Sequence, residues 1–562
     1  LTARGWLLER TAVPEPPLRN AGNFLALNEN QQCAYQMIAR APPEYRAHLL
    51  HGITGSGKTE IYLHLIRDAL DAADQALVLV PEIGLTDQLV TRFRECFGNL
   101  VAVVHSGLGE AARIAAWHAC REKRVKILLG TRSAVWLPLP SLRLVIVDEE
   151  HDLSYKQQDG LRYSARDVAV MRARRAGIPV VLGSATPSLE SFANCESGKY
   201  RYVELTERAG GAEPPVIKLI DVRSRPLTAG ISEPLRLAIN AVLERGEQVL
   251  VFLNRRGYAP IVLCHRCGWI ASCERCDARL VLHKLAAQLR CHHCGAVRSL
   301  RADFATHACG RLSDYVELGI GTEQIESTLT EWFPDHRIVR IDRDTMTRKG
   351  QLERALAQIR AGYVDIVVGT QMISKGHHFA GVTLVAIVDA DSRLLANDFR
   401  AEEHFMQLVI QVAGRAGRGK QAGTVLLQTH HPHHPIFPFV VSGRYKDFVQ
   451  HALRERKAAE LPPFRPLALL RAEATVRAAP LQFLQNVADA LRRQKIEGVS
   501  IDGPIAALME KRVGKFRANL MLLAQDRQRL ARTLSHCLAI IEKSATAKKV
   551  RWTLDVDAQD VL

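Results

Sequence analysis

The densest group of reactive side chains in this sequence is a set of seven cysteines between Cys264 and Cys309. Six of them form three C-x2-C pairs. Two thiolates that stand two residues apart can bind one tetrahedral zinc ion, and two such pairs complete a site. Two complete sites would need eight cysteines, so the count is one short of two sites. The expected zinc ligands are Cys264, Cys267, Cys273, Cys276, Cys291, Cys294 and Cys309.

A second motif, at residues 52–59, has the pattern G-x4-G-K-T. The backbone N–H groups of such a loop surround phosphates at the start of a helix. An apolar stretch at 48–50 precedes the motif and a segment of helical period at 60–70 follows it. We expect Lys58 to reach the β- and γ-phosphates of ATP and Thr59 to hold Mg²⁺. The expected nucleotide-binding residues are Gly52, Thr54, Gly55, Ser56, Gly57, Lys58 and Thr59.

Charged residues at two further places fit the same chemistry. Asp148 ends an apolar run, where a second ligand of Mg²⁺ belongs, and Glu149 beside it can activate the attacking water. Arg415 and Arg418 are three residues apart, so one face of a helix can present both to a γ-phosphate as arginine fingers. The sequence therefore predicts ATP hydrolysis by Lys58, Asp148 and Glu149 with these two arginines.

The elements that must position these residues alternate along the chain. Short apolar runs are separated by segments of helical period, which is typical of parallel α/β sheets with both faces covered. We expect two such units joined by residues 209–225, with the cysteines interrupting the second, and a separate α+β domain from about residue 440. The predicted strands of the first unit are 76–80, 101–105, 126–130, 142–148 and 179–183, and those of the second are 248–253, 337–342, 364–369, 382–389 and 424–428.

Composition limits the possible functions. The chain has 562 residues, enough for several domains, and its 75 Lys and Arg exceed its 59 Asp and Glu. A net charge of +16 favours a nucleic acid as partner. No apolar run reaches the roughly 18 residues of a membrane span. Clustered cysteines favour metal in a reducing cytoplasm over disulfides, and a first residue of Leu1 indicates a fragment.

The motifs together resemble those of superfamily 2 helicases. Gln31 resembles the upstream glutamine that reads adenine in these enzymes. Further matching segments, which in these helicases touch the DNA backbone or couple the lobes, are 80–86, 130–133, 183–187 and 369–379. This resemblance implies two RecA-like lobes.

The order of three segments is narrower still and resembles the PriA family of bacterial replication restart. These are residues 254–260, the cysteines directly after them, and then residues 319–324. The resemblance implies an ATP-dependent 3′→5′ DNA helicase that binds and remodels stalled forks and initiates primosome assembly. It also implies single-strand-binding protein and primosome proteins as partners of an expected monomer. The alternatives are a double-strand DNA translocase, or a loading scaffold whose ATPase activity is secondary.

The same resemblance implies domain boundaries. Residues 1–24 would be the remnant of a winged-helix region and a linker, and the domain that recognises a 3′ end would be missing. Preference for a 3′-OH at the fork would then be lost. Lobe 1 would comprise 25–208, lobe 2 would comprise 209–435 with a zinc-binding insertion at 262–312, and a C-terminal DNA-binding domain would comprise 436–562.

The family's pairing of cysteines implies an inner site of Cys273, Cys276, Cys291 and Cys294. The outer site would have Cys264, Cys267 and Cys309, with Thr306 where the family has a cysteine. His307 is a candidate fourth ligand, whereas His265, His292 and His293 are expected to be solvated. We therefore predict one firm zinc and a second whose fourth ligand is open.

Two segments are candidates for DNA contact. Tyr155, Lys156 and Tyr163 lie where the family has an aromatic-rich loop that signals DNA contact to the ATPase site; packing is the other interpretation of the tyrosines. The basic cluster consists of Lys511, Arg512, Lys515, Phe516, Arg517 and Asn519, and it suits a nucleic-acid strand. A solvated basic face is the other interpretation, and the resemblance favours DNA. The histidines at 430–434 are expected to form a loop after the last strand of lobe 2.

Overall fold

The computed structural model describes residues 22–40, 44–70, 74–82, 85–209, 213–254, 262–276, 279–283, 288–291, 295–299, 309, 315–317, 321–342, 344–346, 350–373, 379, 381–417 and 423–560. These residues form two compact units. The first contains residues up to 48, then 57–148 and 165–182, and the second contains 49–56, 149–164 and the described residues from 183 onward. Each described helix is too short or too polar to span a bilayer.

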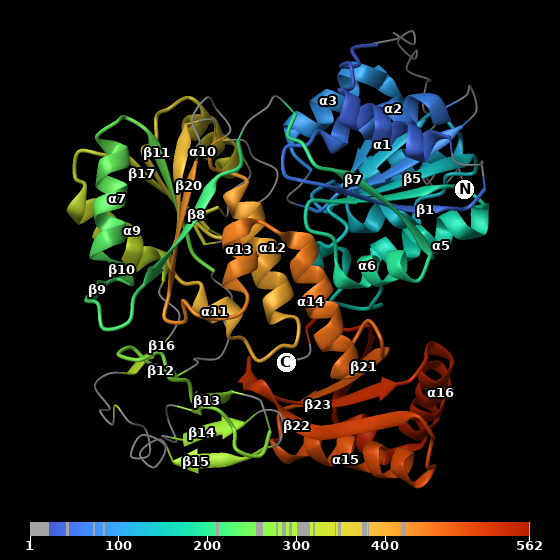
Figure 1. Ribbon diagram of the computed structural model, residues 1–562. Helices are drawn as coiled ribbons and strands as arrows, with labels where there is room; N and C mark the ends of the chain where they lie inside the picture. The colour runs from blue at the N-terminus through green and yellow to red at the C-terminus, as the bar shows by residue number, and fades with distance from the viewer. Residues whose placement is uncertain are drawn as a thin grey trace, which may run out of the picture. The chain divides into compact units, whose positions relative to one another are not determined.

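A seven-stranded sheet lies in the N-terminal part of the chain (Figure 1), and both units contribute residues to it. Strand β2 pairs in parallel with β4 and β5, and β3 pairs in parallel with β4. The order is β3 (Val101–Val104), β4 (Ile127–Gly130), β2 (Gln75–Leu79), β5 (Leu142–Asp148), β6 (Val180–Ser184), β1 (Ala47–Gly52) and β7 (Tyr200–Leu205). The helices of this region are α1 (Glu29–Ala39), α2 (Lys58–Ala69), α3 (Asp87–Phe97), α4 (Glu110–Arg121), α5 (Ala165–Ala176) and α6 (Leu189–Glu196).

Local sequence explains where several of these elements begin. Every residue of β1, β2, β4 and β6 is buried, as expected for strands covered on both faces. Asn28, Thr86 and Ser188 precede α1, α3 and α6, and the side chain of each accepts a backbone N–H of the first turn. The short 3-10 helices in this part are η2 (Gly98–Leu100), η3 (Arg132–Trp136) and η4 (Leu153–Tyr155).

The second unit contains a six-stranded sheet in which neighbouring strands pair in parallel. Its order is β17 (Ile338–Ile341), β18 (Ile366–Gly369), β11 (Gln248–Phe252), β19 (Val382–Ile387), β20 (Thr424–Thr429) and β8 (Val216–Asp221). The associated helices are α7 (Glu233–Leu243), α9 (Thr322–Trp332), α10 (Gln351–Arg360), α11 (Asp391–Leu394), α12 (Ala401–Ala413), α13 (Phe437–Ser442) and α14 (Tyr445–Ala458).

Alternate residues of the central strand β11 enter two different cores. Val249 and Val251 pack with residues of α7 and α9, whereas Leu250 and Phe252 pack with residues of α10 and α12–α14. Both faces of the sheet are therefore covered, and Figure 1 shows α7 and α9 on one side of it. The predicted α/β class with two RecA-like lobes is confirmed.

The cysteine region is inserted between β11 and α9. It contains a two-stranded sheet and a three-stranded antiparallel sheet around a small core that includes Leu280, Leu289 and Cys291. The strands are β12 (Val262–Cys264) with β16 (Tyr315–Glu317), and β13 (Leu280–His283), β14 (Gln288–Cys291) and β15 (Val297–Ser299). A small hairpin of β9 (Leu227–Thr228) and β10 (Ile231–Ser232) precedes α7.

The C-terminal domain is an antiparallel sheet with two long helices, orange to red in Figure 1. The order is β22 (Val499–Arg512), β23 (Lys515–Ala524), β21 (Leu467–Ala474) and β24 (Arg551–Val556). The helices are α15 (Ala478–Arg493), α16 (Arg527–Lys543) and the 3-10 helix η7 (Ala545–Lys549). Residues of β21, β23, α15 and α16 share one core, so the predicted α+β domain is confirmed.

Each apolar run that was predicted as a strand overlaps a strand of the structure. Strand β7 was not predicted, and β8 lies inside the segment expected to be a linker. Residues 216–221 instead pair with β20 along the edge of the second sheet. Their burial is partial, as at a sheet edge, which explains why the segment lacks the continuous apolar run used to recognise the other strands.

Candidate functional site

The predicted phosphate-binding residues occupy the turn between β1 and α2. Gly55 and Gly57 have φ values of 84° and 79°, a conformation that is strained for residues with a Cβ. The Ser56 N–H donates a 3.0 Å hydrogen bond to the carbonyl of Ile53, which closes the turn. Lys58 begins α2, so the first-turn N–H groups and the partial positive charge of this helix lie at the loop. The backbone has the features required for binding a nucleotide phosphate.

The carboxylate of Asp148, at the end of β5, is connected to α2. The hydroxyl of Tyr62 donates a 2.9 Å hydrogen bond to Asp148 Oδ1, and the Tyr62 side chain is buried. Both residues belong to the first unit. Tyr62 was not predicted as a site residue, because only its place in a helical segment, four residues after Lys58, could be recognised.

The next two carboxylates differ in their surroundings. Glu150 is buried and accepts hydrogen bonds from the Ser188 N–H at 2.7 Å, the Ser188 hydroxyl at 3.1 Å and the Ser191 hydroxyl at 2.9 Å. Glu149 has a φ of 45°, and its Oε2 atom lies 3.6 Å from His151 Nδ1 but makes no hydrogen bond within the described part of the chain. Its side chain is 34% exposed. Glu150 therefore holds the start of α6, whereas Glu149 retains acceptor capacity for a water molecule.

His151 lies among residues from two other segments of the second unit, 184–186 and the end of α12. Its Nδ1 is 2.7 Å from the Ser184 hydroxyl, and its Nε2 is within hydrogen-bond distance of the Gln411 side-chain amide. The Thr186 hydroxyl is 3.5 Å from the same Nε2. Both His151 and Gln411 stand inside segments that the sequence singled out, but neither was assigned a role.

Arg415 follows α12, and its side chain is buried. Gly414, just before it, has no room for a side chain, because a Cβ there would lie 2.5 Å from the Thr54 Cγ2 atom. The phosphate-loop residue Thr54 and Gly414 both belong to the second unit. Arg415 is therefore next in sequence to a residue that touches the loop. Arg418 and the segment 374–378 lie outside the described residues.

Gln31 has a structural contact that the sequence did not predict. Asn28 and Gln31 form a capping box, with the Gln31 N–H donating to Asn28 Oδ1 at 2.8 Å and the Asn28 N–H donating to Gln31 Oε1 at 3.0 Å. This pair fixes the start of α1. Adenine recognition by Gln31 stays a prediction.

Three of the expected inner zinc ligands lie together. The sulfur atoms of Cys273, Cys276 and Cys291 are all within 4.8 Å of one another. They form no disulfide, and the Arg275 N–H points to the Cys273 sulfur at 3.4 Å. A gathered, unoxidised set of thiols fits a zinc ion. Cys294, with His292 and His293, lies outside the described residues.

The expected outer ligands are arranged in the same way. The sulfur atoms of Cys264, Cys267 and Cys309 lie within 4.8 Å of one another, and the Trp269 N–H points to the Cys267 sulfur at 3.4 Å. The tight turn is closed by the Gly268 N–H, which donates to the Cys264 carbonyl at 2.7 Å. These residues also fit a zinc ion, whereas Thr306 and His307 lie outside the described residues.

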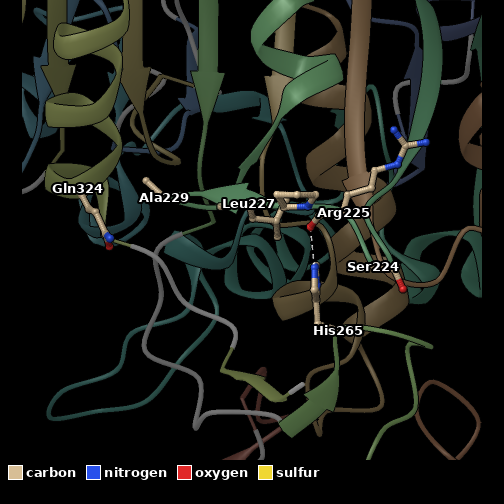
Figure 2. Close-up of a pocket in the computed structure, with 8 residues that line it drawn as sticks. Ser224, Arg225, Leu227, Ala229, His265 and Gln324 are labelled. Carbon is tan, nitrogen blue, oxygen red and sulfur yellow. Dashed lines mark hydrogen bonds between the residues drawn. The ribbon is translucent and has the colours of Figure 1, made fainter. Parts of the chain in front are cut away.

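The outer turn, Cys264–Gly268, packs against the end of the second sheet. His265 Nε2 donates to the Arg225 carbonyl at 2.7 Å, as Figure 2 shows, and His265 Nδ1 lies 2.9 Å from His430 Nε2. His265 was expected to be solvated, and this was wrong: the imidazole is half-buried because the turn docks on the strand end. The adjacent pocket has a volume of about 560 Å³ and is lined by Ser224, Arg225, Pro226, Leu227, Ala229, Gly230, His265 and Gln324.

The histidines at 430–434 follow β20, as predicted. His430 Nδ1 lies 2.8 Å from an oxygen of the buried Asp391 carboxylate. Burial, together with the charge of Arg279, lowers the pKa of His434 to about 4. Burial is also the main cause of a lowered pKa at His431. Both imidazoles are therefore neutral at pH 7 and belong to a packed loop.

The candidate DNA-contact residues are only partly free to meet DNA. Tyr155 is fully buried, which confirms packing for that side chain, and Lys156 is buried with it. In the basic cluster, Lys511 stacks on Phe516 with 5.3 Å from the ammonium to the ring centre, and Lys515 pairs with Glu473 at 3.0 Å. Asn519 is buried inside the sheet.

Four family models match consecutive parts of the chain. The first is the DEAD/DEAH box helicase model, at residues 28–194, and the helicase conserved C-terminal domain matches 315–420. Between them, the Cys-rich region (CRR) domain of the PriA DNA helicase matches 273–298. The primosomal protein N C-terminal domain matches 457–559.

Full-length relatives agree with these matches. The replication restart protein PriA of Haemophilus influenzae is 43% identical over 572 residues, covering 100% of this chain and 77% of that protein. The protein of the same name from Bacillus subtilis is 36% identical, over 95% of this chain and 66% of that protein. The one from Rickettsia conorii is 38% identical, over 94% of this chain and 81% of that protein. The chain is therefore an ATP-dependent DNA helicase with a role in replication restart, and it belongs to the family of the replication restart protein PriA.

Proposed function

We propose that this chain unwinds DNA in the 3′→5′ direction, binds and remodels stalled replication forks, and initiates primosome assembly. The observation that supports this most is the presence of one cysteine-rich insertion and one ATPase motif set in a chain that matches PriA proteins over nearly its whole length. Single-strand-binding protein and the proteins that load the replicative helicase are the proposed partners of a cytoplasmic monomer.

Strand displacement tests the polarity and the substrate. Partial duplexes with only a 3′ tail or only a 5′ tail, and a synthetic fork, are incubated with ATP and Mg²⁺. We expect displacement from the 3′-tailed duplex and from the fork. Displacement only from the 5′ tail would contradict the polarity, and removal of a third strand from a triplex without unwinding would favour a double-strand translocase. Primosome assembly supported by Lys58→Ala would favour a scaffold.

For the ATPase site, we propose that Lys58 contacts the β- and γ-phosphates and that Thr59 and Asp148 hold Mg²⁺. Mg²⁺ would screen the charge on the phosphates. Gln31 would read adenine, and Gly52, Thr54, Gly55, Ser56 and Gly57 would supply the backbone around the phosphates. The hydrogen bond from Tyr62 supports this assignment, because it orients the Asp148 carboxylate at the end of β5.

We propose that Glu149 orients and deprotonates the attacking water. Its acceptor capacity supports this, whereas Glu150 already accepts three hydrogen bonds from Ser188 and Ser191. Arg415 and Arg418 would stabilise the negative charge that develops on the γ-phosphate. The close approach of Gly414 to Thr54 supports the role of Arg415.

For the cysteines, we propose one zinc at Cys273, Cys276, Cys291 and Cys294 and a second at Cys264, Cys267 and Cys309 with His307. Zinc would hold together a module whose apolar core is small. Metal analysis of Cys276→Ser, with Cys195→Ser as the control, tests the inner site. We expect loss of one zinc per chain in the first variant and none in the second; retention of zinc in Cys276→Ser would contradict the assignment.

We propose the domain boundaries that the sequence suggested. Residues 25–208 form lobe 1 and 209–435 form lobe 2, with the zinc-binding insertion at 262–312. Residues 436–562 form a C-terminal DNA-binding domain. The placement of β8 in the second sheet supports a boundary before residue 216.

A further inference from the structure

The segment that follows the acidic motif contacts β24, the last strand of the C-terminal domain. Lys156 Nζ lies 2.9 Å from Asp555 Oδ1, and the two side chains are only 3% and 2% exposed. The same ammonium donates to the Val556 carbonyl at 2.6 Å. Both partners belong to the second unit. A charge pair this deeply buried is costly to separate, because either partner alone would keep an uncompensated charge.

A second cation reaches the same carboxylate from the same loop. The Arg162 guanidinium lies 3.3 Å from Asp555 Oδ2. The two arms of this loop pair with each other. The Gln157 N–H donates to the Tyr163 carbonyl at 2.8 Å, and Lys156 and Ser164 form an antiparallel bridge. The base of the loop is therefore closed like a hairpin, and Asp555 binds both of its arms.

The connection back to the ATPase motif is short and well packed. Asp152 Oδ1 accepts the Ser154 N–H at 2.8 Å and begins η4, which ends at the buried Tyr155. Upstream, Glu150 is fixed by the serines of α6. The Asp152 N–H donates to the Glu149 carbonyl at 2.8 Å, and the Lys156 N–H donates to the Leu153 carbonyl at 3.1 Å. Hydrogen bonds therefore connect the segment from Glu149 to Lys156.

Asp555 is held firmly within the sheet of the C-terminal domain. It lies on β24, paired with Leu469 of β21, and the neighbouring Leu554 packs toward the core formed by α15 and α16. Arg471 of β21 is 3.9 Å from the same Asp555 carboxylate. Asp555 therefore belongs to the folded sheet of the C-terminal domain and connects that sheet to residues 149–164.

We propose that Asp555 is a positioning residue for ATP hydrolysis: through Lys156 and Arg162 it couples the C-terminal domain to the acidic motif, so that DNA binding accelerates hydrolysis only while this contact is intact. The proposal rests on the proposed role of Glu149. It assigns to the C-terminal sheet a part in ATPase stimulation, in addition to any contact that it makes with DNA.

The test measures ATP hydrolysis with and without saturating single-stranded DNA. We expect Asp555→Asn to keep the DNA-free rate and the affinity for DNA, measured by fluorescence anisotropy, and to lose most of the stimulation. Asp557→Asn is the matched control: Asp557 pairs with Arg527 at 2.7 Å, two residues further on, but the pair is exposed. This variant should be stimulated like the unmodified chain.

Asp555→Asn leaves Lys156 and Arg162 without their carboxylate partner. A folding defect must therefore be separated from a loss of coupling. The double variant Lys156→Met with Asp555→Asn removes the contact together with both of its buried charges, and it leaves Arg162 without a partner carboxylate at position 555. If this variant unfolds at a normal temperature and binds DNA but is still stimulated as strongly as the unmodified chain, the proposal is overturned. If either variant fails to fold, the same measurement on Lys156→Gln decides in the same way.

Failure of the wider functional proposal would look different. Lys58→Ala should lose hydrolysis both with and without DNA, and an unmodified chain without DNA-stimulated hydrolysis would contradict the helicase roles themselves. Loss of stimulation with a normal DNA-free rate, restricted to variants of the Lys156–Asp555 contact, is the result that supports the present inference.

Discussion

The Tyr62 hydroxyl donates a 2.9 Å hydrogen bond to Asp148, and this bond connects the first helix after the phosphate loop to the strand that ends in the acidic motif. The two residues are 86 positions apart in the sequence. Because Tyr62 is one turn after Lys58 on α2, the bond sets the distance between the two residues proposed to bind phosphate and Mg²⁺.

Tyr62→Phe should therefore lower both the rate of hydrolysis and the stability of the fold. A hydrogen bond to a charged group contributes about 1.5 to 3 kcal/mol, so we expect a roughly tenfold or greater fall in kcat. The Mg²⁺ concentration for half-maximal activity should rise as well. Tyr35→Phe is the control, because the Tyr35 hydroxyl, on α1, also donates to a carboxylate, that of Asp68 on α2. An equal loss in both variants would argue against a specific role of Tyr62.

The two neighbouring carboxylates should respond differently to the same substitution. Glu149→Gln should abolish hydrolysis while ATP still binds, because an amide is a poor proton acceptor. Glu150→Gln should instead lower stability by about 1 to 3 kcal/mol, since the amide group cannot accept all three of the hydrogen bonds that the carboxylate accepts. Single-turnover hydrolysis and thermal unfolding separate the two effects. Normal hydrolysis by Glu149→Gln would refute the assignment of the base.

Local patterns account for most of the fold and for part of the site. The strands were predictable because a buried parallel strand is a continuous apolar run, and the phosphate loop because its glycines and lysine have fixed spacing. The docking of His265 on His430 was not predictable, because 165 residues separate the two histidines and neither lies in a periodic pattern. Lys156 and Asp555 illustrate the same limit: buried charges look like surface charges in a sequence until their partner is known.

A buried carboxylate near the end of β19 should make stability depend on pH. Burial is the main cause that raises the pKa of Asp389 to about 6, against an ordinary value of 3.8. The folded state therefore binds more protons than the unfolded state between about pH 4 and pH 6. The stabilising contribution is present below pH 4 and is lost as the pH rises to 6. Because the residue keeps some exposure, the loss is about 1 to 2 kcal/mol.

Asp389→Asn should remove this dependence. At pH 8 the variant should unfold at a higher temperature than the unmodified chain, and at pH 4 it should not. Its Oδ1 can still accept the Ser392 N–H, which is 3.0 Å away. Asp391→Asn should behave oppositely at pH 8, because the Asp391 carboxylate accepts hydrogen bonds from Thr429 and from the His430 N–H. Thermal unfolding followed by circular dichroism at the two pH values measures both variants. Equal shifts in the unfolding temperature of Asp389→Asn at pH 4 and pH 8 would contradict the raised pKa of Asp389.

The contact of the outer turn with the second sheet should determine whether the outer zinc is held. Gly268 has a φ of 81°, and a Cβ there would lie 2.7 Å from the His430 carbonyl oxygen. Alanine at this position must move either the turn that carries Cys264 and Cys267 or the end of β20. We therefore expect Gly268→Ala to lose one zinc per chain and to retain the zinc at the inner cysteines.

Gly246→Ala separates backbone strain from the clash. Gly246 has a φ of 71°, but a Cβ there would meet nothing within 4 Å. Its alanine variant should lose about 1 kcal/mol of stability and keep its full zinc content. Metal content is measured by elemental analysis after dialysis against a weak chelator. If Gly268→Ala keeps as much zinc as Gly246→Ala, the outer turn does not need its contact with His430, and the sheet end has no part in holding the metal.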